Sequence, residues 1–210
     1  MVGMSPAWRE RAARNWRTYF DSYVTEARNR RDHVLLDLPG YLALRRRSIA
    51  TDPVLDLAER AAHVETRDAA FHSRLLVDVR RITSDVVILV NDVCSVEKEE
   101  ARNDPHNVVL VLQRAGAAGR REVLARVAAL VRERVTEFAA LRRALTDEPH
   151  RFGLDPVDLP AVAHYLSAAA ACMRGNDDWG RRSARYRTGV PATAGAVAER
   201  TACLPDTVPG

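Results

Sequence analysis

An apolar run inside a long helical pattern constrains the fold of this chain more than any other feature. The run "VVILV", residues 86–90, lies within about 37 residues, 66–102, whose pattern is helical throughout. At 1.5 Å per residue such a helix is roughly 55 Å long. Because its middle is apolar almost all round, we expect it to pass through the centre of the domain.

Nearly all of the remaining chain also predicts helices, and no strand pattern of note is present. Proline and glycine at 39 and 40 are expected to break the chain, and "RGNDDW", 174–179, to form a kink. The expected helices cover residues 6–30, 41–47, a segment opened by Asp52-Pro53, 107–114, 120–146 and 156–173. The sequence therefore predicts an all-α fold.

The two ends of the chain carry their own patterns. Ser5-Pro6 is a typical helix start. The helix that follows has an aromatic and alanine stripe at spacings of three and four, which predicts a face toward the core: Trp8, Ala12, Trp16, Tyr19, Tyr23 and Ala27. "WGRRSARYR" closes the ordered part. Residues 189–210, rich in Pro, Thr and Ala, are expected to be a disordered tail after one domain at 1–188.

Composition excludes several classes of protein. A hydrophobic content of 47% over 210 residues is enough for one domain with a core and excludes wholesale disorder. No apolar run approaches the roughly 18 to 20 residues of a membrane span, and the first residues lack a secretory apolar region. The three cysteines are scattered, which indicates reduced thiols and a cytoplasmic location.

Charge argues against nucleic acid as a partner. The formal net charge is +4, and Lys98 is the only lysine among 32 basic residues. The arginines are spread over amphipathic segments, with no basic block interleaved with aromatics. A helical DNA-binding regulator also requires a turn-linked recognition helix, which the pattern lacks.

Oxygen-bearing side chains follow the apolar run directly, in "NDVCSVEKEE", residues 91–100. Asn91, Ser95 and Glu99 are spaced by four, so they share one helix face. Amide, hydroxyl and carboxylate oxygens are hard ligands suited to Mg²⁺ or Mn²⁺. Lys98 follows Asn91 by seven positions, and a cation there implies an anionic substrate. Without further context, such a triplet is most often a solvated helix face.

Four segments together resemble one family. "NDVCSVEKE" is similar to the motif N(D/E)xxSxx(K/R)E of class I terpene synthases of the bacterial sesquiterpene cyclase type. "DPHNVV" looks like the hN(l/v)V segment of that family, "WGRRSARY" like its C-terminal Arg-Tyr pair, and "GYLALRRRS" like its eYlxlRr segment. Their order and spacing fit, and the resemblance covers residues 8 to about 187.

The resemblance implies an antiparallel helical bundle that ionises a prenyl diphosphate. It also implies farnesyl diphosphate as the substrate and Mg²⁺, or alternatively Mn²⁺, as the cofactor. It implies that Asn91, Ser95 and Glu99 chelate one metal ion. Diphosphate contacts would come from Arg45 (or the adjacent Arg46), Lys98, Arg185 and Tyr186. Candidate residues that line an apolar cavity for the carbocation are Phe71, Val87, Ile88 and Trp179. The resemblance also implies a homodimer as one possible assembly.

One motif of the family is missing. Its aspartate-rich DDxx(D/E) normally lies roughly 90 to 100 residues before the sensor arginine, which senses the substrate diphosphate and for which Arg45 is the candidate here. Only 44 residues precede Arg45, and none of them forms the motif. We therefore expect the C-terminal part of the fold, without its N-terminal helices, and weak or no activity alone. A late start codon, a pseudogene product and a subunit completed by another chain all remain open. The alternative function is a non-catalytic fragment acting as a helical interaction module.

Overall fold

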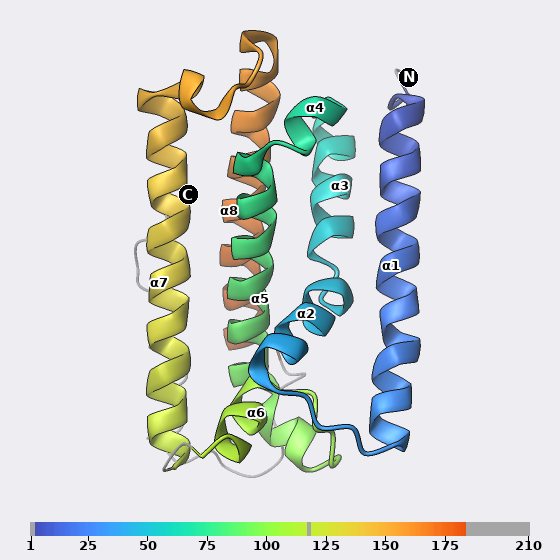
Figure 1. The fold of residues 1–210 in the computed structure, drawn as a ribbon, viewed down its shortest axis with the longest axis vertical. Coiled ribbons are helices and arrows are strands. Elements are labelled where there is room, and N and C mark those ends of the chain that lie inside the picture. Colours follow the sequence, from blue (N-terminus) through green and yellow to red (C-terminus); the bar gives the residue numbers. More distant parts are fainter. Residues whose placement is uncertain (1–2, 117–118, 184–210) are drawn as a thin grey trace.

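The computed structural model of this chain describes residues 3–116 and 119–183, and every regular element in these ranges is a helix. The all-α class is confirmed. The long helices stand side by side, with α4 at one end of the bundle and α6 near the other (Figure 1). The elements are α1 Pro6–Arg31, α2 Leu38–Ser48, α3 Thr51–Ala62, α4 Asp68–Phe71, α5 Arg74–Glu100, α6 Val108–Arg114, α7 Arg120–Asp147, the 3₁₀ turns η1 Pro149–Phe152 and η2 Pro156–Asp158, and α8 Leu159–Arg182.

Helix α5 runs through the centre, as the apolar run predicts. Every residue from Ile82 to Val90 is buried. The helix packs most extensively against α8 and α7, and α3 and α2 flank it on the other side (Figure 1). A helix enclosed on all sides carries apolar residues around its whole circumference.

The predicted continuous helix over 66–102 is wrong at its start, because the chain forms two helices there. Ser73 adopts extended backbone between α4 and α5. Its hydroxyl accepts a hydrogen bond from the backbone N–H of Leu76 at 3.4 Å, so it caps α5. A serine side chain can hydrogen-bond to nearby backbone groups, and so it favours a helix start over the continuation of a helix. The apolar period continues across the break, which hides it from a pattern analysis.

The predicted core-facing stripe of α1 is only partly confirmed, since Ala12 is buried and Trp8, Trp16 and Tyr19 are half-buried, whereas Tyr23 and Ala27 are exposed. The buried face of this helix is mostly polar and includes Arg11, Ser22 and Glu26. Phe20 and Tyr23 are 58% and 43% exposed. The rings of Trp16, Tyr19, Phe20 and Tyr23 instead pack against one another along the helix. The ion pairs of Arg11 with Asp56 and Glu59 on α3 decide which side of α1 faces inward.

Two predicted interruptions do not occur. Pro39 and Gly40 lie inside the first turn of α2, where proline is tolerated because no N–H is needed. Asp37 caps that turn by accepting the Gly40 N–H at 2.9 Å. Helix α8 continues through 174–179 to Arg182, and only its first expected residues, 156–158, form the separate turn η2.

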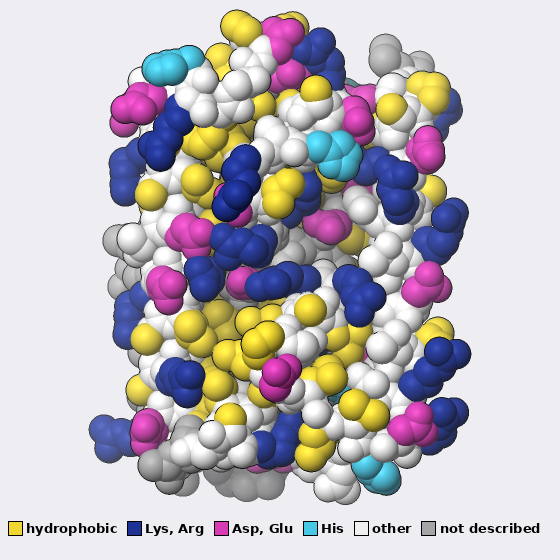
Figure 2. All heavy atoms as spheres, in the orientation of Figure 1, with side chains coloured by type: hydrophobic (Ala, Val, Ile, Leu, Met, Phe, Trp, Pro, Cys, Tyr) yellow, Lys and Arg dark blue, Asp and Glu magenta, His cyan; other side chains and the backbone are white. Residues whose placement is uncertain are grey.

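Parts of the prediction fall beyond the described residues. The expected tail at 189–210 lies there, as do Arg185 and Tyr186. Across the two described ranges, no helix combines the length and apolarity needed to cross a membrane. Figure 2 shows Lys and Arg side chains spread over one whole face, with Asp and Glu side chains among them.

Candidate metal and diphosphate site

The three predicted metal ligands occupy the last turns of α5. Asn91 and Glu99 are half-buried and Ser95 is 1% exposed. Asn91 lies beside α2, since its Oδ1 is 3.5 Å from the Arg45 guanidinium. Glu99 lies beside the segment that leads into α6, where its Oε2 accepts a hydrogen bond from Asn107 at 2.7 Å. The candidate site therefore lies between α2, α5 and the start of α6.

Asp92, next to Asn91, ties these three elements together. Its carboxylate is fully buried and accepts hydrogen bonds from the hydroxyl of Tyr41, from Arg45 at 3.3 Å and from the backbone N–H of Val108 at 2.8 Å. No role for Asp92 follows from the sequence pattern. The only available signal was its place in the motif, beside Asn91.

Asn107 is a second residue without a predicted role. Its side chain is fully buried. Its amide nitrogen donates to the backbone carbonyl of Asp92 and to Glu99 Oε2, both at 2.7 Å, and its Oδ1 accepts the Val109 N–H at 2.8 Å. One side chain thus joins two separate turns of α5 to the start of α6.

The two candidate arginines turn to different partners. Arg45 is 12% exposed and points to Asn91, Asp92 and the hydroxyl of Ser48, which is 3.2 Å away. Burial opposes the charge of Arg45, yet the Asp92 carboxylate and other nearby negative charges hold its pKa above the usual value. Arg46 instead forms a two-pronged pair with Asp85 at 2.7 and 3.0 Å. Of the two, Arg45 is the one that lies beside Asn91.

The carboxyl groups of the site have too little positive charge around them to offset their burial. Burial, followed by the neighbouring charge of Asp92, raises the pKa of Glu99 to about 7. Burial also raises the pKa of Asp92, although Arg45 acts in the opposite direction. A cation placed beside Glu99 would favour its ionised form. The electrostatics of this end of α5 therefore suit a bound metal ion.

The Ser95 hydroxyl also fits a metal ion. Its Oγ is buried and, among the described residues, has no hydrogen bond of ordinary geometry, although the hydroxyl is close enough to Glu99 to lower the pKa of that carboxyl. A buried polar atom without a hydrogen bond of ordinary geometry is rare, and a bound ion is one explanation for it. The described part of the chain holds no group of three or more His, Cys, Asp or Glu side chains suited to a metal. A metal here would use the amide, hydroxyl and carboxylate oxygens of Asn91, Ser95 and Glu99, a donor set suited to Mg²⁺ or Mn²⁺.

The other predicted residues are placed in different parts of the bundle. Lys98 is in the last turn of α5, next to Glu99. Val87 and Ile88 are buried about one turn before Asn91. Trp179 on α8 is 60% exposed. Phe71 belongs to α4 at the opposite end of the bundle, where its ring lies 3.8 Å from the Arg80 guanidinium (Figure 1).

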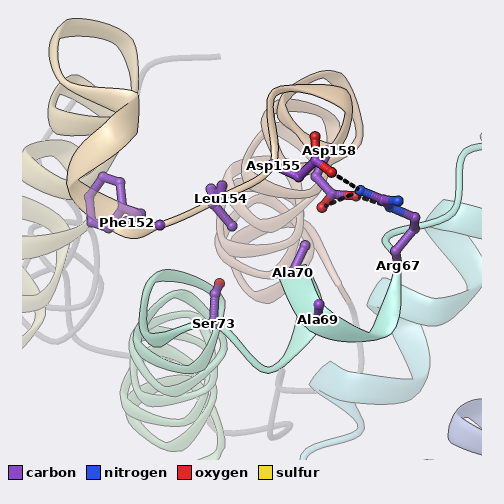
Figure 3. Close-up of a pocket in the computed structure, with 9 residues that line it drawn as sticks. Arg67, Ala69, Ala70, Ser73, Phe152, Leu154, Asp155 and Asp158 are labelled. Atoms are coloured by element: carbon purple, nitrogen blue, oxygen red, sulfur yellow. Dashed lines mark hydrogen bonds and ion pairs between the residues drawn. The ribbon is translucent and has the colours of Figure 1, made fainter.

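A hollow of about 570 Å³ also lies at that opposite end, between α4, the start of α5 and the segment 152–158. Figure 3 shows Arg67 reaching across to Asp155 and Asp158, with Phe152 and Leu154 further along. The guanidinium is 3.0 Å from Asp155 and 2.6 Å from Asp158. The hollow lies at the other end of α5 from the candidate site, and its charged residues pair with one another, so it is a separate feature.

A match to a protein family agrees with this geometry. The family described as "Terpene synthase family 2, C-terminal metal binding" matches residues 1–137, which include α1 to α6 and all three candidate ligands. This chain belongs to that terpene synthase family. Metal binding is thus a property of the matched region in the family, while the identity of the ion is a matter for proposal.

Curated relatives of this terpene synthase chain include several bacterial cyclases. Pentalenene synthase from Streptomyces arenae is 38% identical over 196 residues, which are 92% of this chain and 58% of that protein. The (-)-beta-caryophyllene synthase of Saccharothrix espanaensis, described as cyclising (2E,6E)-farnesyl diphosphate, is 39% identical over 88% of this chain and 52% of its own length. The chain therefore spans little more than half the length of these relatives.

Solved structures show the same fold. The linalool/nerolidol synthase from Streptomyces clavuligerus, in complex with 2-fluorogeranyl diphosphate, superposes with a TM-score of 0.78 at 35% identity, over 87% of this chain and 61% of the other. Wild-type cucumene synthase superposes with a TM-score of 0.71 at 29% identity, over 87% and 60%. The resemblance to class I terpene synthases is confirmed, and the antiparallel bundle belongs to that fold.

Proposed function

We propose that this chain provides one metal-binding half of a site that ionises a prenyl diphosphate, with Mg²⁺ as the ion and farnesyl diphosphate as the substrate. The single observation that carries the proposal is that Asn91, Ser95 and Glu99 are spaced by four in the last turns of α5, with Arg45 beside Asn91. Three oxygen ligands and a guanidinium suit a diphosphate that is bound through a metal ion.

Each residue has a distinct task in this proposal. Asn91, Ser95 and Glu99 would hold the ion, which supplies Lewis-acid stabilisation of the diphosphate leaving group. Arg45 pairs with phosphate oxygens through its planar fork, and Lys98 adds a point charge. Asp92 keeps Arg45 charged and oriented toward Asn91. Val87 and Ile88, buried just before the ligands, extend an apolar surface that excludes water from the carbocation.

The substrate is proposed from the relatives. One of them is described as cyclising farnesyl diphosphate, and a structural neighbour holds a fluorinated geranyl diphosphate. We also propose that this chain alone turns over slowly or not at all, because the sequence contains no DDxx(D/E) motif. A single metal site would then offset only part of the charge of the diphosphate.

Binding tests the site and turnover tests the reaction. The 210-residue chain should bind Mn²⁺ together with inorganic diphosphate in calorimetry. Glu99→Gln should weaken that binding by about tenfold or more, the loss typical of a metal-site residue. Glu100→Gln is the matched control, since Glu100 is exposed at the end of the same helix and pairs with Arg120. Equal loss in both variants, or no binding by wild type, would contradict the proposal.

Diphosphate release from farnesyl diphosphate with Mg²⁺ should be far slower than for full-length pentalenene synthase assayed alongside. Turnover equal to that enzyme would contradict the proposed dependence on a second metal motif. The second candidate function, a non-catalytic helical interaction module, is favoured by the lack of a DDxx(D/E) motif in these 210 residues. It predicts no binding of Mn²⁺ and diphosphate.

A further inference from the structure

We propose that Asn107 is a positioning residue that fixes the Glu99 carboxylate for metal binding and couples it to the turn of α5 that carries Asn91. The proposal rests on the proposed function, because it concerns the same metal site. It follows from the contacts of a fully buried side chain whose oxygen and nitrogen are both used.

Capping alone does not explain an asparagine at this position. As the N-cap of α6, Asn107 needs only an acceptor, and its Oδ1 fills that role with the Val109 N–H at 2.8 Å. Serine, aspartate and threonine cap helices in the same way. The amide nitrogen adds two donors that a cap does not require. Both are used, one on the Asp92 carbonyl and one on Glu99 Oε2.

The contact with Glu99 controls a flexible ligand at a helix end. Glu99 lies in the last turn of α5, and its backbone carbonyl accepts the Arg102 and Asp104 N–H groups that turn the chain toward Asn107. A free glutamate side chain samples many rotamers, and holding it in one of them before the ligand arrives lowers the entropic cost of binding. The Asn107 amide engages Oε2, so Oε1 remains to coordinate a cation.

The contact with Asp92 sets the distance between the two ends of the metal site. The Asp92 carbonyl belongs to the turn of α5 that also presents Asn91, about two turns before Glu99. Because the same NH₂ group holds both turns, a movement of Glu99 away from Asn91 requires one of the two hydrogen bonds to break. Outer hydrogen bonds of this kind orient metal ligands in proteins.

A pair of cap variants separates positioning from stability. Asn107→Ser keeps a capping oxygen and removes the amide donors. Ser73→Ala removes a cap at the far end of α5, away from the site, and serves as the control for lost stability. Mn²⁺ affinity would be measured by electron paramagnetic resonance with inorganic diphosphate present, alongside urea unfolding of each variant. We expect Asn107→Ser to lower Mn²⁺ affinity by about tenfold or more and Ser73→Ala to leave it within about twofold.

A second measurement tests the hydrogen bond between Asn107 and Glu99 in the absence of metal. In nuclear magnetic resonance of the 210-residue chain, the two amide protons of Asn107 give separate signals because rotation about the amide C–N bond is slow, and each proton faces a different acceptor. Glu99→Ala should shift only the proton that faces Oε2 and speed its exchange with water. The chemical shift of the proton that faces the Asp92 carbonyl should stay the same. If Glu99 only stabilised the end of the helix, its removal would be expected to change both signals.

The outcomes distinguish the two proposals. Equal Mn²⁺ affinities of wild type and Asn107→Ser, or an amide signal that ignores Glu99→Ala, would overturn the positioning role and leave the proposed function standing. Absence of Mn²⁺ binding by wild type would overturn the proposed function together with the metal role of Asn107. Loss of affinity in Asn107→Ser alone, with the selective amide shift, supports both.

Discussion

The hydroxyl of Tyr41 on α2 donates a hydrogen bond to the carboxylate of Asp92 on α5, and both side chains are buried. Burial, followed by the charge of Asp92, raises the pKa of Tyr41 well above its usual value, so the hydroxyl keeps its proton at neutral pH. The bond joins the helix that carries Arg45 to the helix that carries Asn91. The relative position of these two helices therefore depends on a polar contact inside the core.

Removing this donor should destabilise the fold. Tyr41→Phe leaves the buried Asp92 carboxylate short of one hydrogen bond, which costs about 1 to 3 kcal/mol. Tyr165→Phe is the matched control, because the Tyr165 hydroxyl is equally buried and has no hydrogen-bond partner among the described residues. Its removal should be neutral or stabilising. Urea unfolding of the two variants measures the difference, and equal free energies of unfolding would contradict the role of the Tyr41 bond.

Diphosphate affinity should depend on Arg45 and not on Arg46. Arg45→Lys replaces a planar fork beside Asn91 with a single ammonium, and it should weaken binding of inorganic diphosphate with Mn²⁺ by about tenfold, equivalent to about 1.4 kcal/mol. Arg46→Lys, the neighbouring control, should change it less than about twofold because Arg46 is committed to Asp85. Calorimetry on the two variants decides the question; a larger loss in Arg46→Lys would assign the sensor role to that residue instead.

Features confined to one helix were predictable from the sequence. The central position of α5 follows from its apolar run, and the grouping of Asn91, Ser95 and Glu99 follows from a spacing of four. The break at Ser73 was missed because the apolar period continues across it. The inward side of α1 was predicted only in part, because Arg11 is buried by charged partners on α3 that only the folded chain brings close.

The contacts around the candidate site also could not be predicted from the sequence, because they join different helices. Asp92 and Asn107 act through contacts with α2 and α6, and periodicity along one helix carries no information about them. Both residues lie in segments that resemble a family pattern, but that resemblance gave neither of them a role. Long-range hydrogen bonds decide what each side chain does, and sequence spacing does not encode them.

The contribution of Asp56 to stability should fall as the pH rises through the range in which this carboxyl ionises. Asp56 on α3 is 1% exposed and accepts a hydrogen bond from Asn15 at 2.8 Å. Burial raises the pKa of this carboxyl to about 6, although Asn15 and Arg11 act in the opposite direction. The folded state therefore binds more protons than the unfolded state between about pH 4 and pH 6. The contribution of Asp56 is fully present below its unfolded pKa and is lost as the pH passes the folded value.

Asp56→Asn should remove this dependence. Raising the pKa of Asp56 to about 6 corresponds to roughly 3 kcal/mol, so the variant should gain up to about that amount relative to wild type between about pH 4 and pH 7. Urea unfolding at the two pH values measures the gain. Asp147→Asn is a suitable control, because Asp147 is exposed at the end of α7. Parallel pH profiles for wild type and Asp56→Asn would show that burial of Asp56 is not the cause.

Two glycines of α8 should respond in opposite ways to alanine. Gly175 has open space around it, so Gly175→Ala should stabilise the helix by about 0.5 to 1 kcal/mol. At Gly180 an added Cβ would lie 2.8 Å from the Cys94 sulfur on α5, so Gly180→Ala should cost about 1 to 3 kcal/mol through overpacking. Urea unfolding of both variants measures the two changes, and a loss of stability in Gly175→Ala would contradict the first.

The cause at Gly180 can be isolated with a double variant. Without the sulfur, the nearest atom to the new Cβ is the Cβ of residue 94 at 3.6 Å, an ordinary contact. Gly180→Ala should therefore cost much less in a Cys94→Ala background, with a coupling free energy of at least about 1 kcal/mol in a double-mutant cycle. Additive effects of the two changes would show that α8 does not approach α5 this closely beside the candidate metal site.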